Sequence, residues 1–437
     1  MRTLVKRRVV HQSSPICTIN LVGLRTSHGE PLTGIMTAET DGQNAQPTHL
    51  FAQFTKRDAI LYALGIGCCS DAEELSTSIN NNRAKNDTSK HRELRYVYEN
   101  HPEFEPFPTF LLSLIFQSQL MKSHDTTSGK DDATINRLGF GIRPFPPESL
   151  GDGSGSGVIP KAFFRDPTCI ENVRDLPVLH TSQKFTLHKP FGHQLSVHGQ
   201  DRPINVWLVT RIVSIEPKSI GTFVTTETKF YQMEKQSKVC VATSQMTALV
   251  FGLDPDLVRR YRATIKSAEK QSIVTTSKVY KSYTYQIPPN AALIYRLSGD
   301  YNPIHVENDA VLLNKEQGQS SKKGAVLHGS CTLGYAVRAV LRHANARSLQ
   351  KSKLFSVECN FVKPVFVGDT LVVTVSDEPD HDVLQSCGLL WVCFKLYRSA
   401  DFAGNADAKN EIVVDNGVAL LSCYDHTGTE LSEVSRL

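Results

Sequence analysis

A short cluster of turn-forming residues interrupts an apolar stretch in the second half of the chain. The cluster falls within five positions and consists of Gly299, Asp300, Asn302 and Pro303. Such residues end a helix or strand in a tight loop, which here presents Asp300 and His305 together. At neutral pH an aspartate is ionised and an imidazole is mostly neutral, so the two can orient a water and move its proton. The plainer alternative is a capped turn, in which Asp300 bonds backbone amides and His305 is a surface residue.

The segment from Tyr295 to Ala310 reads Y-R-L-S-G-D-Y-N-P-I-H-V-E-N-D-A. It resembles the signature of the MaoC-like hydratases, the (3R)-specific 2-enoyl-CoA hydratases called hydratase 2. Gly324–Tyr335 resembles the start of the central helix in that family, and Phe361–Leu371 resembles the strand and turn that follow it. Asp58–Gly67 and Val97–Phe110 are more faintly similar to the amino-terminal half of the eukaryotic two-unit hydratases, such as the hydratase unit of the peroxisomal multifunctional enzyme.

The resemblance implies an α+β double hot-dog fold, in which each half is a long helix wrapped by an antiparallel β-sheet. The residues agree, because strand-like runs rich in Val, Ile, Thr, Phe and Tyr follow one another with short turns between them. These runs cover residues 183–190, 204–215, 221–233, 238–251, 355–362, 371–375, 389–397 and 413–424. Apolar residues spaced three and one apart from Leu333 to Ala344 predict a helix that begins just after Gly329.

Two lysine-proline steps indicate an internal repeat. Lys189–Pro190 and Lys363–Pro364 each follow a strand-like run, and they lie 174 residues apart. The first half has no G-D-x-N-P-x-H loop. It is therefore expected to repeat the fold without the chemistry and to accommodate the acyl chain.

The start of the first half carries a helix signal. Thr55 is a plausible N-cap with Asp58 three positions later, close to a capping box, and the predicted helix ends at Gly65 or Gly67. Residues 108–120 are apolar on nearly every side and are predicted to be buried.

The length of 437 residues exceeds what one core usually supports, which favours two units. The expected division is a basic arm at 1–45, a non-catalytic hot-dog half at 46–275 with flexible insertions near 76–92 and 122–160, a catalytic MaoC-like half at 276–434, and a targeting tripeptide at 435–437. The tripeptide Ser435–Arg436–Leu437 is close to the peroxisomal address S-K-L. Residues 1–29 contain no Asp or Glu, so a mitochondrial signal is the alternative.

Composition excludes several classes of function. The 48 basic and 44 acidic residues nearly balance and form no basic stripe, which gives no support to nucleic-acid binding. Apolar runs fall far below the ~18 to 20 residues that span a bilayer. The ten cysteines include no CxxC pair, and His188, His193 and His198 lack neighbouring ligands, so no metal is expected. No cofactor is expected, since no Gly-rich dinucleotide fingerprint follows a strand.

The resemblance assigns roles to individual residues. Asp300 and His305 would hold and activate a water, with Asn302 helping to orient it, and which proton each of the pair moves is left open. The backbone amide of Gly329 would face the oxyanion of the thioester, because the first amides of a helix are free to bind a ligand. Substrate contacts are expected from His180, Thr181, Lys218, Tyr301 and Phe361.

For three further residues the sequence also allows a role outside catalysis or substrate binding. Thr181 stands where the family has glycine, which puts a close backbone contact in doubt. Lys218 could meet a CoA phosphate, although a turn lysine is usually solvated. His328 is expected to pack or bond locally rather than to act as an acid.

The implied function is hydration of trans-2-enoyl-CoA to (3R)-3-hydroxyacyl-CoA in peroxisomal fatty-acid β-oxidation, with an acyl-CoA thioester as the substrate. Two alternatives stay open: a 3-hydroxyacyl thioester dehydratase of fatty-acid synthesis, and a non-catalytic acyl-CoA-binding protein. Expected partners are the peroxisomal import receptor, through the S-R-L ending, and a second copy of the chain in a homodimer.

Overall fold

The structure is a computed structural model that describes residues 47–70, 93–120, 165, 178–192, 195, 202–234, 236–262, 281–307, 325–346, 352–377, 389–399 and 410–422. The expectations for residues 1–45, 76–92, 122–160 and 435–437 fall outside these described residues.

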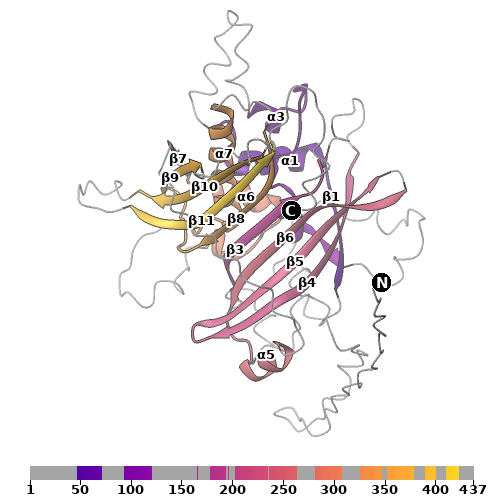
Figure 1. Ribbon diagram of the computed structural model, residues 1–437, viewed down its shortest axis with the longest axis vertical. Helices are drawn as coiled ribbons and strands as arrows, with labels where there is room; N and C mark the ends of the chain where they lie inside the picture. Colours follow the sequence, from indigo (N-terminus) through magenta and orange to yellow (C-terminus); the bar gives the residue numbers. More distant parts are fainter. Residues whose placement is uncertain are drawn as a thin grey trace, which may run out of the picture.

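Within the described residues, eleven strands form one antiparallel sheet in the order β2-β1-β4-β5-β6-β3-β8-β11-β10-β9-β7. The first half supplies β1 (Thr48–Phe54), β2 (Gln119–Leu120), β3 (Val178–Leu187), β4 (Ile204–Lys218), β5 (Gly221–Glu234) and β6 (Ser237–Val250). The second half supplies β7 (Lys281–Gln286), β8 (Lys353–Phe361), β9 (Thr370–Asp377), β10 (Leu389–Arg398) and β11 (Glu411–Ser422). Figure 1 shows the magenta strands of the first half continuing into the orange and yellow strands of the second.

The two halves repeat one strand order. From the outer strands of the sheet toward its middle, the order β1-β4-β5-β6-β3 of the first half corresponds to β7-β9-β10-β11-β8 of the second. The lysine-proline steps follow the equivalent strands β3 and β8. After each of them the chain bonds the neighbouring strand in the same way, since the Lys189 amide donates to the Val241 carbonyl at 3.3 Å and the Lys363 amide to Val413 at 3.4 Å. The predicted internal repeat is therefore confirmed.

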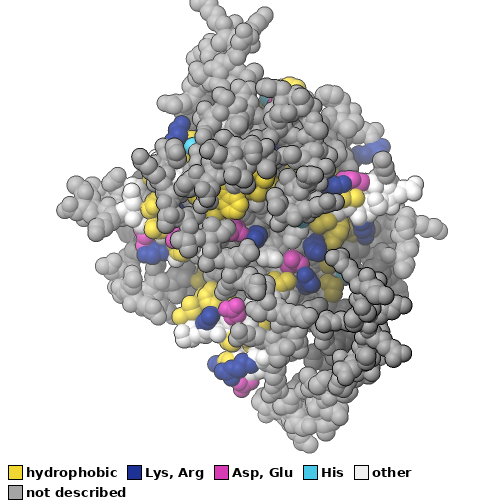
Figure 2. All heavy atoms as spheres, in the orientation of Figure 1, with side chains coloured by type: hydrophobic (Ala, Val, Ile, Leu, Met, Phe, Trp, Pro, Cys, Tyr) yellow, Lys and Arg dark blue, Asp and Glu magenta, His cyan; other side chains and the backbone are white. Residues whose placement is uncertain are grey.

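The long strands alternate between the core and the outer face, because successive side chains point to opposite faces of a sheet. Val206 and Leu208 of β4 and Phe230 of β5 are fully buried. The outer face carries paired charges, with Lys184 Nζ 3.1 Å from Glu358 Oε2 and an Arg211–Glu227 pair. On the face seen in Figure 2, the described lysine and arginine side chains are scattered, and several lie beside acidic side chains.

The long helix α7 (Gly329–Ala346) lies against β7, β8, β9 and β10. It begins at Gly329 as predicted, and its apolar stripe is buried, with Leu333, Val337 and Val340 completely so. The shorter described helices are α1 (Lys56–Gly65), α3 (Leu94–Val97), α4 (Leu111–Gln117), α5 (Pro255–Arg262), α6 (Ala291–Tyr295) and the 3₁₀ turns η8 (Arg296–Ser298) and η9 (Pro303–His305). None of the described helices has the length and hydropathy needed to cross a membrane.

Helix α1 starts and ends where the sequence predicts. The Thr55 amide donates to Asp58 Oδ2 at 2.8 Å, and the helix ends at Gly65. The strand β1 just before it was not predicted, because its identity depends on pairing with β4 rather than on its own residues. The first half also differs in detail, since its described helices contain ten residues or fewer.

A buried ion pair joins α7 to the first half. Arg338 Nε and Nη2 lie 3.0 and 2.9 Å from the two carboxylate oxygens of Glu93, and Arg342 Nε lies 3.0 Å from Oε1. Arg338 Nη1 also donates to the Ile66 carbonyl, just after α1. Burial alone would raise the pKa of Glu93, but attraction to the two guanidinium groups outweighs it and lowers the pKa. The contact holds the central helix against α1.

Candidate active site

The predicted turn lies where α6 and η8 end. Gly299 adopts a φ of +118°, a conformation that side chains beyond glycine rarely adopt. The chain then turns through Asp300 into η9, whose start is capped by Asn302: its Oδ1 accepts from the Ile304 amide at 3.2 Å. The turn formers seen in the sequence therefore define this loop.

The plainer alternative, a capped turn with a surface histidine, is right only in part. Asp300 Oδ1 does accept from a backbone amide, that of Asn302, at 3.3 Å. His305, in contrast, is buried, with 8% of its surface exposed. A turn that only needed capping would not require an imidazole inside the protein.

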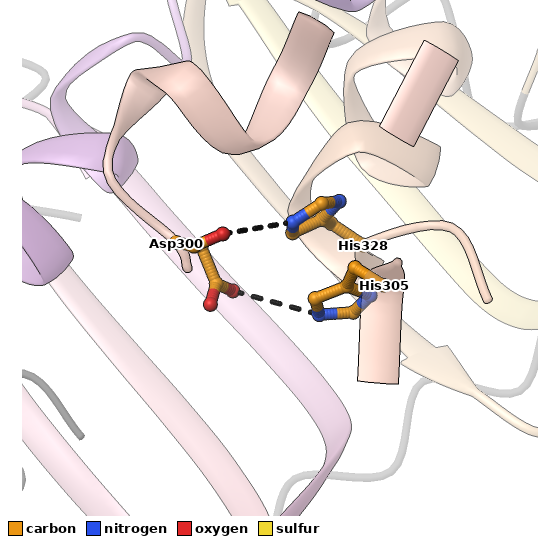
Figure 3. Close-up of side chains that lie close together, drawn as sticks. All are labelled: Asp300, His305 and His328. Atoms are coloured by element: carbon orange, nitrogen blue, oxygen red, sulfur yellow. Dashed lines mark hydrogen bonds and ion pairs between the residues drawn. The ribbon is translucent and has the colours of Figure 1, made fainter. Parts of the chain in front are cut away.

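Asp300 and His305 face one another across a short gap (Figure 3). His305 Nδ1 lies 2.8 Å from the Val326 carbonyl, which can only accept, so we assign the ring proton to Nδ1. In the neutral ring Nε2 is then an acceptor, and it lies 3.8 Å from Asp300 Oδ2. Two acceptors at this separation can each receive one hydrogen from the same water molecule.

His328 contacts both Asp300 and His305. Its Nε2–H donates to the Asp300 carbonyl at 3.1 Å, and its ring stacks on that of His305 with centroids 3.5 Å apart. The Tyr295 ring lies 4.8 Å away, centroid to centroid. The expectation that His328 packs and bonds locally is confirmed by these contacts.

Burial shifts the pKa of each group toward its uncharged form. It raises the pKa of Asp300, against the opposing influence of His305 and the Asn302 amide. It lowers the pKa of His305, against the attraction of Asp300, and it lowers the pKa of His328, with His305 adding to the effect. Both imidazoles are therefore mostly neutral near neutral pH, and Asp300 binds a proton more readily than an exposed aspartate does.

Gly329 begins α7 next to His328, as predicted. The Thr332 amide makes a helical bond to the His328 carbonyl at 3.0 Å, so the amides of the first turn, which precede it, have no acceptor within the helix. A Cβ atom on Gly329 would lie 2.9 Å from His180 Nδ1. The glycine therefore allows β3 of the first half to approach the start of the helix.

His180 and Phe361 pack together beside Gly329. Their ring centroids are 4.6 Å apart, although they come from β3 and β8 of different halves. Burial lowers the pKa of His180 to about 4. One predicted substrate contact, His180, thus meets the predicted oxyanion residue, and Phe361 packs against it.

Two other predicted substrate contacts, Thr181 and Tyr301, are engaged by different neighbours. Thr181 is the extra residue of a β-bulge between His180 and Ser182, and its hydroxyl donates to the Thr247 carbonyl at 3.0 Å. Tyr301 lies in the loop under the guanidinium group of Arg296, 4.9 Å from the ring centroid.

Lys218 lies at a distance from these residues. It is the exposed last residue of β4, a strand that lies three positions from β3 in the sheet, and its Nζ lies 3.6 Å from Glu216 Oε2. The structure does not bring it into the cluster, and its contact with CoA stays a prediction.

One residue at the loop was missed by sequence reasoning. Gln117 Nε2, at the end of α4, donates to the Ser298 carbonyl at 2.6 Å. The two residues are 181 positions apart, so no local pattern signals the contact.

Asp300, His305 and His328 offer ligand atoms that all lie within 4.8 Å of one another, which raises the question of a metal. Stacked rings inclined by only 23° direct their in-plane lone pairs along separate, nearly parallel planes. One ion at the usual ~2.0 to 2.1 Å from both nitrogens therefore does not fit. Each ring also bonds a backbone carbonyl through its other nitrogen.

Comparisons with known proteins agree with this arrangement. Residues 269–387 match the MaoC like domain, and residues 52–138 match the MFE-2 hydratase 2 N-terminal domain. A solved MaoC-like dehydratase from Phytophthora Capsici has a TM-score of 0.53 at 19% identity, covering 87% of this chain and 97% of that one. The chain thus has a double hot-dog fold, and part of its second half is similar to the MaoC like domain.

Two curated relatives extend over most of the chain. Peroxisomal multifunctional enzyme type 2 of Mus musculus is 23% identical over 351 residues, which cover 79% of this chain and 36% of that protein. Enoyl-CoA hydratase 2, peroxisomal, of Arabidopsis thaliana is 22% identical over 332 residues, 73% of this chain and 80% of that protein. The chain is thus similar to hydratase 2 proteins over most of its length, and it spans about a third of the length of its multifunctional relatives.

Proposed function

We propose that the protein is a hydro-lyase that adds water to trans-2-enoyl-CoA and forms (3R)-3-hydroxyacyl-CoA. One observation carries the proposal: two acceptors, Asp300 Oδ2 and His305 Nε2, lie 3.8 Å apart beside a helix N-terminus. The names of the relatives support the substrate class, since one is called an enoyl-CoA hydratase 2.

In the proposed reaction a water donates one hydrogen to each acceptor. Its oxygen forms a bond to C3 of the enoyl thioester while the pair takes a proton from the water. The π electrons of the C2–C3 bond move into an enolate on the thioester oxygen. The pair then returns a proton to C2, so that atoms and charge balance. A carboxylate and a neutral imidazole fit this cycle, because either group can hold the proton taken from the water until it is returned to C2.

The enolate oxygen would be stabilised by the amide of Gly329. Free N–H groups at a helix N-terminus are directed at a developing negative charge without reorganisation during the reaction. His180 and Phe361 would contact the substrate beside this amide, with Thr181 and Tyr301 close to them along β3 and the loop. Lys218 would meet a CoA phosphate at the surface. Asn302 would orient the water while it caps η9.

We further propose that residues 46–275 form the non-catalytic half and residues 276–434 the catalytic half. In this division the first half accommodates the acyl chain. The strand repeat supports the boundary, since β3 and β8 adjoin where the halves meet.

The experiment that tests the function is a hydration assay with crotonyl-CoA and a ten-carbon enoyl-CoA, resolving 3R from 3S product. We expect 3R product from both, with a kcat/KM for the longer substrate equal to or above that for crotonyl-CoA. Turnover of neither substrate would contradict the proposal and favour a binding protein. Turnover restricted to four carbons would contradict the acyl-chain role of the first half.

A dehydratase working in the reverse direction uses the same atoms, because the two directions share one transition state. Measuring the rate from 3-hydroxyacyl-CoA in the same preparation gives the ratio of the two directions. The intact Asp300 and His305 argue against a protein that only binds acyl-CoA.

The pH dependence of kcat should differ from that of an ordinary histidine. The reaction needs Asp300 ionised and His305 neutral. Burial raises the pKa of Asp300 above its ordinary 3.8 and lowers that of His305 below its ordinary 6.5. Both groups gain a proton as the pH falls, so kcat should decline toward acidic pH, and the loss that comes from protonation of His305 should occur below pH 6.5. A profile of kcat from about pH 4 to about pH 9 measures it, and a kcat that rises as the pH falls would contradict it.

A peroxisomal location is part of the proposal, supported by the names of the relatives. If Ser435–Arg436–Leu437 is an import signal, a fluorescent protein fused ahead of the chain should appear in peroxisomes. Deleting Leu437 should make it diffuse. A second fusion, with the fluorescent protein after the chain so that residues 1–29 stay at the free amino terminus, tests the alternative. Mitochondrial fluorescence that depends on those residues would support it.

A further inference from the structure

The catalytic loop is held from the half of the protein that has no catalytic loop. Gln117 ends α4 in the first half, and its Nε2 donates to the Ser298 carbonyl at 2.6 Å. Ser298 is the last residue of η8, two positions before Asp300. Carbonyls at a helix end have no N–H donor within the helix, so this bond supplies a donor to the Ser298 carbonyl.

The side chain of Gln117 also packs closely against the turn at Gly299. A Cβ atom on Gly299 would lie 2.3 Å from Gln117 Cγ and 3.3 Å from its backbone nitrogen. The glycine is therefore needed twice, for its φ of +118° and for the approach of α4. Such a fit leaves the turn little freedom to move toward the first half.

Helix α4 is itself firmly anchored. Phe110, at its N-cap, packs against Phe54 and Tyr62 with ring centroids 4.9 and 5.6 Å away. Leu111 and Leu114 are completely buried. Gln117 thus extends from a rigid element.

On its other side the loop is held by the second half, where His328 donates to the Asp300 carbonyl at 3.1 Å. The three residues from Ser298 to Asp300 are therefore fixed at both ends, one end by each half. We propose that Gln117 is a positioning residue, which sets the direction of Asp300 toward His305 through Ser298 and Gly299. The inference rests on the proposed function, and it makes the first half a structural part of the catalytic site.

The test removes the donor while keeping the packing. Gln117→Met retains the methylene groups that contact Gly299 but cannot donate to Ser298. Displacement of a catalytic group by about 1 Å can lower the rate up to about 10²-fold, so we expect kcat to fall by about 10-fold or more. KM should stay within about twofold, because the pair acts on the water rather than on the bound thioester.

A matched control removes a similar bond elsewhere. Gln53 Nε2 donates to Asn205 Oδ1 at 2.8 Å between β1 and β4. Gln53→Met should leave kcat unchanged. If both variants lose kcat only in proportion to the loss of folded protein, the role is merely structural and the inference is overturned.

The failure of the inference can be distinguished from failure of the proposed function. Wild-type protein without turnover contradicts the function, whereas active wild-type protein with an equally active Gln117→Met variant contradicts the inference alone. A crystal structure of the Gln117→Met variant tests the inference without relying on activity. Displacement of Asp300 from its 3.8 Å spacing to His305 supports the inference, and retention of that spacing overturns it.

Discussion

Replacing Asp300 by Asn is expected to lower kcat by about 10² or more, the usual worth of general acid-base catalysis. The change keeps the size of the side chain but removes the negative charge that accepts a hydrogen from water. Replacing His305 by Gln should lower kcat similarly, because it removes the proton carrier. If both act on one water, the double variant should lose much less than the product of the two effects. Single-turnover and steady-state hydration assays measure these losses.

Stability separates this expectation from the capped-turn alternative. Burial raises the pKa of Asp300, which means that the folded protein disfavours the charged form. Asp300→Asn should therefore leave the free energy of unfolding unchanged or increase it.

Asp58 provides the matched control, since its carboxylate also bonds a backbone amide, at 2.8 Å from Thr55. Asp58→Asn should lower stability by up to ~1 kcal/mol, as loss of a cap does, without changing kcat per folded molecule. Near-normal kcat in Asp300→Asn or His305→Gln would remove that residue from the mechanism.

Replacing Glu93 by Gln should lower the free energy of unfolding by about 3 to 5 kcal/mol, because it leaves a buried charge without its partner. The Arg338 side chain is completely buried against the Glu93 carboxylate, which also meets Arg342. Burial of a lone guanidinium is unfavourable, and glutamine supplies hydrogen-bond acceptors but no charge. Urea unfolding of the variant and the wild type measures the difference.

The control for Glu93 is a neighbouring pair near the surface. Arg95 Nε lies 3.6 Å from Glu105 Oε1, with 19% and 35% of the two side chains exposed. Glu105→Gln should change stability by no more than about 1 kcal/mol, because solvent screens such a pair. Equal effects of the two substitutions would show that the contact with α7 is not the strong link inferred here.

The sequence by itself determined the elements whose signals are local. The Thr55 and Asp58 capping pair, the apolar stripe of α7 and the alternating strands depend on residues a few positions apart, and all are found in the structure. The loop at Gly299 was also readable, since four turn formers leave the chain no regular alternative. The burial of His305 could not be predicted, because a capped turn with an exposed histidine would have the same sequence.

Contacts between distant segments were decided only by the tertiary structure. Gln117 meets Ser298, Glu93 meets Arg338, and His180 meets Gly329 across separations that no local pattern spans. These contacts follow from the register of β3 on β8 and from the docking of α4 and α7. The physical reason is that local structure depends on neighbouring residues, whereas the position and the pKa of a buried side chain depend on everything that excludes water around it.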